Sequence, residues 1–401
     1  MTEPTSIAAN AINAHGIDLL QKIGKPGENA LISPYSIQNA LVMTYAGAEG
    51  DTRIEMAKVL HYPKEDAELH QSFAALQKAI GDVMKKSTVD AEQTKKRGGK
   101  KDPIALIVAN RLFGQKRHDF RAPFLSLLNN NYGAPLEPAD FANNSADATK
   151  QINDWVADQT RQRICNLIPD GALGELTRLV LVNTIYLKAP WEAEFRESET
   201  KPLPFHTGGG ESVEVPTMTG RRYVSYSRRN GFSVLALPYY GEDIQFLVLL
   251  PDQLNGLAQL ERELTSSLLD TCANEQKQMV VLHLPKFKLT PPLLQLAGEL
   301  QSMGMRNAFD QPRGSANFDR MAPRRPADYL FISAVFHRTF LSLDEKGTEA
   351  AAATAVATRA AGVSFDRTKP VEVRVDHPFL FAIQHRQSGT CLFLGHVKDP
   401  R

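Results

Sequence analysis

Apolar and polar positions along the chain follow two periods, and the switches between them outline the expected elements. Over residues 6–23 the apolar residues recur at the spacing of a helix, and Pro26-Gly27 marks its end. A second helix is expected after Ser33, which suits a helix cap, with Pro34 in the first turn. Helical spacing then continues as far as residue 86. The first part of the chain is therefore predicted to be helical.

Shorter runs of apolar and β-branched residues predict strands farther along. They cover residues 104–113 and 179–188, a hairpin of 234–238 with 244–251, an apolar run over 330–343, and a last hairpin of 379–384 with 391–395. An amphipathic helix is expected over residues 146–167, and a short helix is expected from residue 290, with Gly304 beyond its end.

The arrangement of these elements indicates the fold class. Strands separated by long irregular stretches, with helices gathered at one end, favour an α+β fold over a doubly wound sheet. The length alone would suggest two or three domains, but no linker-like shift in composition divides the chain. A single domain over residues 1–401 is therefore predicted.

Residues 87–103 interrupt the helical pattern with polar, charged and glycine residues, so we expect a solvated surface loop there. Five positive charges fall within seven positions of it, at Lys95, Lys96, Arg97, Lys100 and Lys101. Two interpretations stay open: an ordinary solvated loop, or a site for a polyanion such as a sulfated polysaccharide or a nucleic acid, because basic clusters release counterions from polyanions. The formal net charge of the whole chain is only +1, so no global attraction to nucleic acid or membrane is expected.

The most informative stretch follows the apolar run of 330–343. An acidic, basic and glycine-containing segment, residues 344–349, leads into small uncharged residues over 350–358. Four consecutive alanines favour a helix by propensity, whereas β-branched residues at every second later position favour a strand. Gly347 supplies backbone freedom before the small residues. We interpret this segment as a potential β-strand that can be added to a sheet of the folded protein.

This segment resembles the hinge of the serpin family, and of its inhibitory members in particular. The resemblance rests on Glu345, Lys346, Gly347, Thr348, Glu349, Ala350, Ala351, Ala352 and Ala353. Further motifs occur in the family's order: Asn-Ala-Leu-Ile-Ser-Pro-Tyr-Ser-Ile at 29–37, Gly-Ala-Glu-Gly-Asp-Thr at 47–52, Ile-Asn-Asp-Trp-Val at 152–156, Leu-Val-Asn-Thr-Ile-Tyr-Leu-Lys-Ala-Pro-Trp at 181–191, Leu-Pro-Lys-Phe at 284–287 and Asp-His-Pro-Phe at 376–379. Together they cover nearly the whole chain, which is identified as a member of the family.

The resemblance implies a fold with a large mixed central β-sheet, smaller sheets, helices packed around one end and an exposed reactive-centre loop. The hinge and this loop together are expected over residues 345–375. The resemblance also implies a suicide-substrate inhibitor of serine proteases. In that mechanism the protease cuts the loop and forms an acyl-enzyme, and the freed hinge inserts into the central sheet. The expected partner is a serine protease in a covalent complex, without turnover. The inhibitor itself is expected to be a monomer, with loop-sheet polymers as its mode of failure.

The resemblance also places two groups of residues where the central sheet opens. A polar cluster under the opening is expected to consist of Ser33, Ser36, Asn183 and His337. An ion pair at the top, holding the hinge strand, is expected between Lys286 and Glu345, with Trp191 packed beside it. For His337, a buried hydrogen-bonded histidine is favoured over a general base. For Lys286 and Glu345, a structural pair is favoured over a catalytic acid-base pair.

The scissile bond decides the class of target. Counting from Glu345 with the spacing usual in the family places it at Ala361-Gly362. Alanine before the bond suits elastase-like or subtilisin-like serine proteases. Arg359 would instead suit a trypsin-like enzyme if the distance from the hinge were two residues shorter, and Arg367 is a third option. The three options stay open.

Enzymes and carriers are the competing classes of function. The chain contains no Gly-x-Ser-x-Gly elbow, His-Glu-x-x-His motif, phosphate loop or Gly-x-Gly-x-x-Gly fingerprint, so neither catalytic activity nor a required cofactor is expected. A heparin-like polyanion remains a candidate accelerator. A non-inhibitory carrier or chaperone would tolerate charges or prolines in the hinge, and none occurs over residues 350–358.

The cysteines, the apolar runs and the first residues of the chain indicate which cellular compartments are compatible with this protein. Cys165, Cys272 and Cys391 are too few and too scattered for a disulfide framework, and they lack metal-ligand spacing, so no metal site is expected. No apolar stretch approaches 18 residues, so no membrane span is expected. The first residues have neither a basic flank nor a continuous apolar segment, so we expect no secretory signal in the chain as given. That leaves a cytoplasmic protein, or a secreted one in trimmed form.

Overall fold

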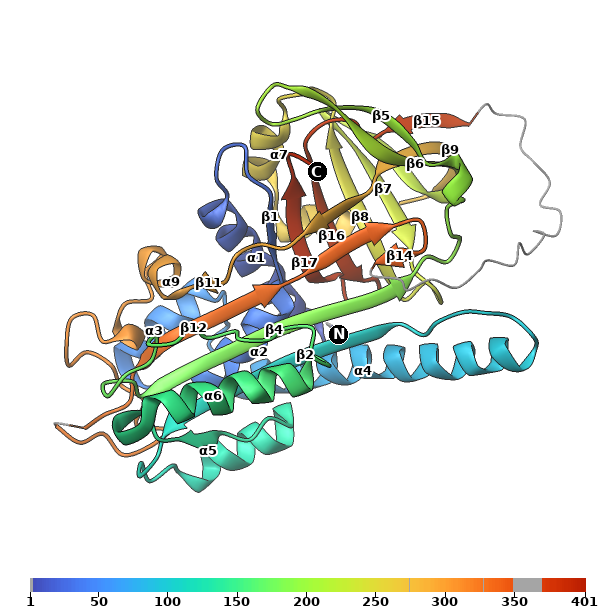
Figure 1. The fold of residues 1–401 in the computed structure, drawn as a ribbon. Helices are drawn as coiled ribbons and strands as arrows, with labels where there is room; N and C mark the ends of the chain where they lie inside the picture. Colours follow the sequence, from blue (N-terminus) through green and yellow to red (C-terminus); the bar gives the residue numbers. More distant parts are fainter. Residues whose placement is uncertain (1–2, 274, 327, 349–369) are drawn as a thin grey trace.

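The computed structural model describes residues 3–273, 275–326, 328–348 and 370–401. Within them the chain folds into two β-sheets surrounded by helices, which Figure 1 colours in chain order from blue to red. The predicted α+β class is therefore confirmed.

One sheet forms the upper part of the molecule in Figure 1. Its strands are β1 (Ala30–Ile32), β5 (Lys201–His206), β6 (Ser212–Arg229), β7 (Phe232–Pro238), β8 (Ile244–Pro251), β9 (Lys277–Pro285), β15 (Val371–Arg374), β16 (Phe379–His385) and β17 (Thr390–Val397). Their order is β1-β17-β16-β8-β7-β6-β9-β15, with β5 paired to β6. The predicted hairpins, β7 with β8 and β16 with β17, are antiparallel neighbours, as expected.

The other sheet, which we call the central sheet, crosses the middle of the molecule. Its strands are β2 (Ala105–Gln115), β3 (Glu137–Ala139), β4 (Leu179–Pro190), β10 (Phe287–Leu289), β11 (Leu294–Gln295), β12 (Ile332–Thr339), β13 (Leu341–Asp344) and β14 (Gly347–Thr348). The sheet is mixed, because β12 runs parallel to β4 while β2 and β14 run antiparallel to it. The apolar run of 330–343 forms two strands of this sheet, and Phe340 separates them.

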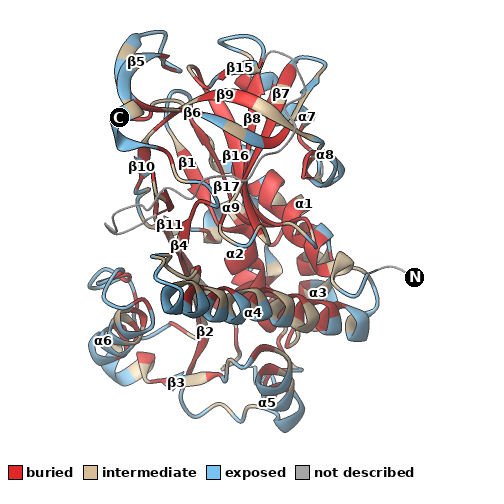
Figure 2. Ribbon diagram, turned by 90° about the vertical axis from the view of Figure 1, so that its right-hand side faces the viewer, coloured by how far each residue is buried: buried red, intermediate tan, exposed pale blue. Residues whose placement is uncertain are grey.

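Helices cover the sheets and fill the space between them. They are α1 (Ser6–Ile23), α2 (Pro34–Tyr45), α3 (Gly50–Val59), α4 (Asp66–Lys96), α5 (Ala122–Leu127), α6 (Phe141–Gln159), α7 (Leu257–Glu263), α8 (Ser266–Cys272) and α9 (Ala297–Met303). α2 contacts β17 of one sheet and β2 and β4 of the other, and every residue of it is buried (Figure 2). The predicted cap is confirmed, since the Ser33 hydroxyl accepts a hydrogen bond of 3.0 Å from the Ser36 backbone N–H.

The predicted loop over residues 87–103 is wrong for its first ten residues. They form the last turns of α4, a helix of 31 residues, and only the short segment from Arg97 to Ile104 links it to β2. The residues that α4 buries there are Ser87 and Ala91, each 5 % exposed. Because small side chains occupy the buried positions, the local sequence carries no apolar helical signal.

Three other helix boundaries differ from the prediction. α6 begins at Phe141 and not at 146. α6 ends at Gln159 and not at 167, because Thr160 bonds back to Val156 O and the next two residues adopt left-handed backbone angles. The helix expected from residue 290 begins only at Ala297, because the preceding β11 pairs with β12. Its end at Gly304 is as predicted, since this glycine has φ of 115°.

The sequence predicted no membrane span, no disulfide framework and no metal site. The structure can be compared with these expectations only over the described residues. No helix among them is both long and apolar enough to cross a membrane. All three cysteines are free thiols, Cys165 exposed and the other two buried. No group of three or more histidine, cysteine or acidic side chains in this part of the chain lies close enough to hold a metal ion.

Candidate functional site

The hinge begins inside the central sheet. β13 and β14 form a tight hairpin whose connecting residues are Glu345 and Lys346, and β14 lies between β13 and the end of β4. Gly347 faces Pro190 with φ of 144°, and a Cβ added to it would lie 2.1 Å from Ala189 O. Only glycine fits this approach of two backbones. Thr348, the next residue, is completely buried.

Below β14 the central sheet is open for a short distance. β4 and β12 pair from Leu179 up to Ile185, opposite Thr339, and pairing on the same side of β4 resumes only at Ala189 with β14. Over residues 186–188, β4 pairs with β2 on one side and with no strand of the described chain on the other. Figure 1 shows β4 in green and β12 in orange running side by side, with β14 near the upper end of β4. β4 and β12 are therefore separated at the end of the sheet where β14 lies.

A buried polar cluster lies within the β4–β12 ladder. Asn183 and His337 are register partners, and the His337 Nδ1–H donates to Asn183 Oδ1, while Asn183 Nδ2 donates to Phe336 O at 2.9 Å. On the other ring nitrogen, His337 Nε2 accepts from the Ser33 backbone N–H at 3.1 Å. Burial lowers the pKa of His337 to about 3. The ring is therefore neutral with both nitrogens engaged, and neither is free to act as a general base.

The two serines extend this cluster to other elements. The Ser33 hydroxyl donates to Leu392 O of β17 at 2.6 Å, and the Ser36 hydroxyl donates to Asn110 Oδ1 of β2 at 2.9 Å. The four residues predicted as one cluster come from three separate parts of the sequence and are brought together, as expected. They link α2, both strands of the parting ladder and the neighbouring sheet.

An ion pair holds the hairpin at the top of the opening. Lys286 Nζ lies 2.7 Å from Glu345 Oε2, and the Thr200 hydroxyl donates to Glu345 Oε1 at 2.7 Å. Burial opposes the charged form, but the hydrogen bonds from Lys286 and Thr200 together hold the pKa of the Glu345 carboxyl below its ordinary value. The expected pairing of these residues is therefore present. Thr200 was not predicted, because nothing in its local sequence marks it.

Trp191 packs beside this pair, as expected, and ties the hairpin to the end of β4. Its Nε1–H donates to Asp344 O and its backbone N–H donates to Lys346 O, both at 2.9 Å. Its ring stacks on Tyr239, with centroids 4.6 Å apart and planes 3° from parallel. The Tyr239 hydroxyl in turn hydrogen-bonds with the Thr348 hydroxyl. Tyr239 was missed, because the sequence placed it in an ordinary hairpin turn.

The five cations of the basic run fall into two groups, exposed side chains and one side chain with structural contacts. Lys95 and Lys96 end α4, and both are exposed, as are Arg97 and Lys100 after it. Lys101 is not part of this exposed group, because its Nζ donates to Trp191 O at 2.9 Å and lies 3.6 Å from Glu194. Four of the five cations named for a possible polyanion site are therefore exposed, while Lys101 makes structural contacts near the hinge.

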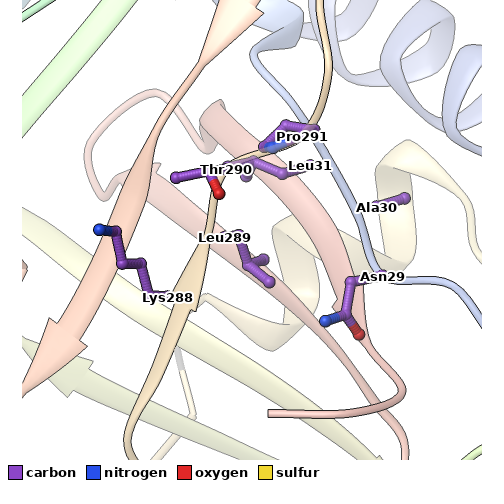
Figure 3. A pocket seen from close by; sticks show the side chains of 7 residues that line it. All are labelled: Asn29, Ala30, Leu31, Lys288, Leu289, Thr290 and Pro291. Carbon is purple, nitrogen blue, oxygen red and sulfur yellow. The ribbon is translucent and has the colours of Figure 1, made fainter. Parts of the chain in front are cut away.

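A cavity of about 220 Å³ lies between the edge strands β1 and β10, and none of the residues predicted for the site lines it. Figure 3 shows the side chains that line it: Asn29, Ala30, Leu31, Lys288, Leu289, Thr290 and Pro291. Asn29 is already engaged, since its side chain amide donates to Asp399 O and its Oδ1 accepts from the Lys398 and Asp399 backbone N–H groups. No carboxylate, histidine or thiol of the described chain lines this cavity, so it offers no acid-base pair.

Part of the predicted site lies outside the described residues. This applies to Glu349, Ala350, Ala351, Ala352 and Ala353 of the hinge, to the predicted bond at Ala361-Gly362, and to Arg359 and Arg367. Both ends of the predicted loop over 345–375 are described, and each contains a strand, β14 at the start and β15 at the end.

Comparison with known proteins gives one consistent family. The family model described as Serpin (serine protease inhibitor) matches residues 10–400. The leukocyte elastase inhibitor of Bos taurus is 36% identical over 403 residues, which cover 98% of this chain and 99% of that protein. An uncharacterized serpin-like protein of Thermococcus kodakarensis is 33% identical over 98% of this chain and 85% of its own.

Solved structures agree with the sequence relatives. Uncleaved ovalbumin superposes with a TM-score of 0.82 at 27% identity, covering 98% of this chain and all of the other. Serpin48 of the insect Tenebrio molitor gives a TM-score of 0.79 at 29% identity, with both chains fully covered.

Proposed function

The chain belongs to the serpin family, and from that premise we propose that it is a suicide-substrate inhibitor of serine proteases that inserts its cleaved loop into the central sheet. Serpins are mostly protease inhibitors, so a protease is the partner to expect. The observation that supports insertion here is β14, which already occupies the place of a strand between β13 and β4. Immediately below it, β4 has an edge without a strand partner in the described chain.

The register of β14 indicates how far insertion can proceed. Thr348 pairs with Ala189, and if this antiparallel register continues down β4, Thr358 comes to lie opposite Leu179, the first residue of that strand. Alternate residues of a strand share a face. The residues that would be buried with Thr348 are Ala350, Ala352, Thr354, Val356 and Thr358. All are small and uncharged, so the interior can accept them without unpaired charge.

The protease would travel with the inserted strand. Ala361 follows Thr348 by thirteen residues, a length of about 40 Å at ~3.3 Å per residue. Insertion also has to separate β4 from β12, which breaks the hydrogen bond between Asn183 and His337. We propose that this bond keeps the sheet closed until the loop is cut. The pairs lost between β4 and β12 are replaced by ladders on both sides of the new strand.

The predicted bond at Ala361-Gly362 favours an elastase-like or subtilisin-like target. Relatives at 33–36% identity that are named leukocyte elastase inhibitors support the first of these. Arg359, or Arg367, would instead direct the inhibitor to a trypsin-like protease. A non-inhibitory carrier is the alternative function, and the absence of charge and proline over residues 350–358 argues against it.

A heparin-like polyanion is proposed as an accelerator, bound by the four exposed cations at the end of α4. Two hydrogen bonds that connect the end of the helix with the hinge support this proposal. The Thr94 hydroxyl hydrogen-bonds with the Tyr240 hydroxyl at 3.1 Å, and Tyr240 follows Tyr239, which contacts Thr348.

The cut bond can be identified directly. The protein is mixed with an elastase-like and, separately, with a trypsin-like protease, and the released peptide is measured by mass spectrometry. Cleavage at the predicted bond releases the segment from Gly362 to Arg401, whereas a peptide starting at Ala360 would indicate Arg359 as the specificity residue. Failure of both proteases to cut anywhere over residues 345–375 would contradict the proposal.

A further inference from the structure

A cavity of about 360 Å³, which shares no lining residue with the one in Figure 3, lies beside α7. Its wall comes from segments far apart in the chain: the turn between α1 and β1, the residues after β5, α7 with the residues before it, and the end of β17. The Gly208 N–H donates to Lys398 O at 2.8 Å and so joins two of these segments. The volume lies within the range of about 300–1,000 Å³ that is usual for small-molecule sites. We call it the α7 cavity.

Apolar side chains supply much of the wall of the α7 cavity. They are Pro26, Leu254, Leu257, Ala258 and Pro378. Leu257 is buried, whereas Leu254 is 54% exposed and so remains in contact with water. An apolar ligand that fills the cavity would remove both its own surface and that of Leu254 from water, which is favourable.

The carboxylate that lines the cavity already has a partner inside the protein. Glu261 pairs with His396, whose side chain is 1% exposed and whose Nδ1 lies 2.6 Å from Glu261 Oε1. The other ring nitrogen, Nε2, donates to Glu28 O at 3.1 Å, because a carbonyl oxygen can only accept. Both ring nitrogens thus face acceptors, so the doubly protonated ring fits this position. Its positive charge offsets the charge of the Glu261 carboxylate.

Lys398 is the charged group at the cavity that lacks such a partner. Its Nζ donates to Lys25 O at 2.8 Å, and no acidic side chain of the described chain forms an ion pair with it. Burial lowers the pKa of the Lys398 amine, although two nearby carboxylates act in the opposite direction. An anion bound beside this amine would stabilise its charged form. His206 also lines the cavity, and within the described residues its ring has no hydrogen bond.

We propose that the α7 cavity binds a small amphipathic carboxylate, with its apolar body against Leu254 and Leu257 and its carboxylate at Lys398 and His206. A medium-chain fatty acid has this chemistry. Charge selects an anion over an organic cation, because the Glu261 carboxylate is already paired and the Lys398 amine is not. The site does not depend on the inhibitor function proposed above, since none of its lining residues belongs to the hinge or the central sheet.

The test is a calorimetric titration of the full chain with decanoate, below the concentration at which it forms micelles. Decyltrimethylammonium, which has the same alkyl chain and a cationic head group, is titrated in parallel. Lys398→Met removes the charge, and Leu254→Ser removes part of the apolar wall. Matched controls are Lys288→Met, an exposed lysine that lines the cavity of Figure 3, and Leu176→Ser, a leucine that is 76% exposed. Thermal unfolding of each variant verifies the fold.

Decanoate should bind the wild type at a single site with a dissociation constant of roughly 10–100 µM, as expected for a ligand of this size. Lys398→Met should weaken binding about 10-fold, and Leu254→Ser a few-fold, while both controls stay within twofold of the wild type. The cationic ligand should bind about 10-fold more weakly than decanoate. The proposal is overturned if the wild type shows no saturable decanoate binding up to about 1 mM, or if Lys398→Met binds decanoate as tightly as the wild type does. Tighter binding of the cationic ligand would also contradict it.

Discussion

At the scale of single residues, Glu345 holds the hinge through both its side chain and its backbone. Its side chain is only 7% exposed and is bonded by Lys286 and Thr200, while its backbone carbonyl accepts from the Phe195 N–H at 2.8 Å. One side chain thus ties the turn between β13 and β14 to two other parts of the molecule.

We predict that Glu345→Lys increases spontaneous polymer formation. It places two positive charges together at a partly buried site, which we expect to weaken closure of the hinge by roughly 2 kcal/mol, between the values for exposed and for fully buried pairs. An opened sheet can then accept a loop from a second molecule. Native gels after incubation at mildly raised temperature measure the loss of monomer.

Glu197→Lys is the matched control for that experiment. Glu197 pairs with Lys346 of the same turn at 3.4 Å, but its side chain is 71% exposed, so loss of this pair has little effect on stability. Equal amounts of monomer in Glu345→Lys and in the control would show that the buried pair does not hold the hinge.

The buried His337 makes stability depend on pH. In the fold its pKa is lowered to about 3 by burial, whereas in the unfolded chain it has the ordinary value of 6.5. Between these values the unfolded state takes up a proton that the fold does not, so the free energy of unfolding falls as the pH is lowered. For one group the slope is at most about 1.4 kcal/mol per pH unit.

Urea unfolding at several pH values between 4 and 6.5 measures this slope. His337→Gln should be less stable than the wild type at neutral pH, because the hydrogen bonds to Asn183 and Ser33 are disturbed. Its stability should also fall less steeply with decreasing pH than that of the wild type. Other histidines with lowered pKa, such as His15, contribute equally to both proteins. Identical slopes would contradict the buried neutral ring.

At the scale of elements, the two-residue strand β14 is bonded from outside the sheet by the Tyr239 hydroxyl, which contacts Thr348. We predict that Tyr239→Phe lowers the free energy of unfolding by about 1–2 kcal/mol, because the completely buried Thr348 hydroxyl loses its partner while the stacking on Trp191 is kept. The neighbouring Tyr240→Phe is the control, since within the described chain the Tyr240 hydroxyl bonds to Thr94 in a part-buried contact. An equal decrease in the free energy of unfolding of the two variants would contradict a stabilising role of the bond between Tyr239 and Thr348.

The end of α4 is the second element with a predicted role. If the four exposed cations bind a polyanion, heparin should raise the rate of protease inhibition, and the effect should fall with increasing salt. Changing Lys95, Lys96, Arg97 and Lys100 to Ala should abolish the effect while leaving the rate without heparin unchanged. Lys101 is kept, because it contacts Trp191. If heparin does not change the rate of the wild type, the four cations belong to an ordinary solvated surface.

Most elements could be predicted from the sequence because their signals are local. Periodic apolar residues outlined α1, and dense β-branched runs outlined β4 and the hairpins. The tail of α4 could not be predicted, because its buried face is made of Ser87 and Ala91 and resembles a polar loop. Boundaries that depend on pairing, such as the late start of α9 after β11, likewise have no local signal.

At the scale of the whole molecule, the candidate site joins residues that are far apart in the chain. Motif resemblance predicted the contact of Lys286 with Glu345 and that of Asn183 with His337, and both are present. It did not predict that Tyr239 reaches Thr348, 109 residues later, or that the hinge already begins within the sheet. Contacts of this kind depend on the assembled fold and leave no pattern in either segment.

The position of Thr348 provides the most direct test of trapping by insertion. Thr348→Arg would place a charge in a completely buried position, at a cost of several kcal/mol if it remains unpaired. The hinge could then neither stay in the sheet nor re-enter it quickly, while the scissile bond would still be cut. Hydrolysis would finish before the protease is displaced, so the variant should act as an ordinary substrate.

The measurement is a denaturing gel of wild type and Thr348→Arg after mixing with an elastase-like serine protease. The wild type should give a covalent complex that survives boiling, and the variant should give mainly the cleaved form. A wild type that yields only cleaved product with elastase-like, subtilisin-like and trypsin-like proteases alike would contradict insertion as the mechanism and favour a carrier.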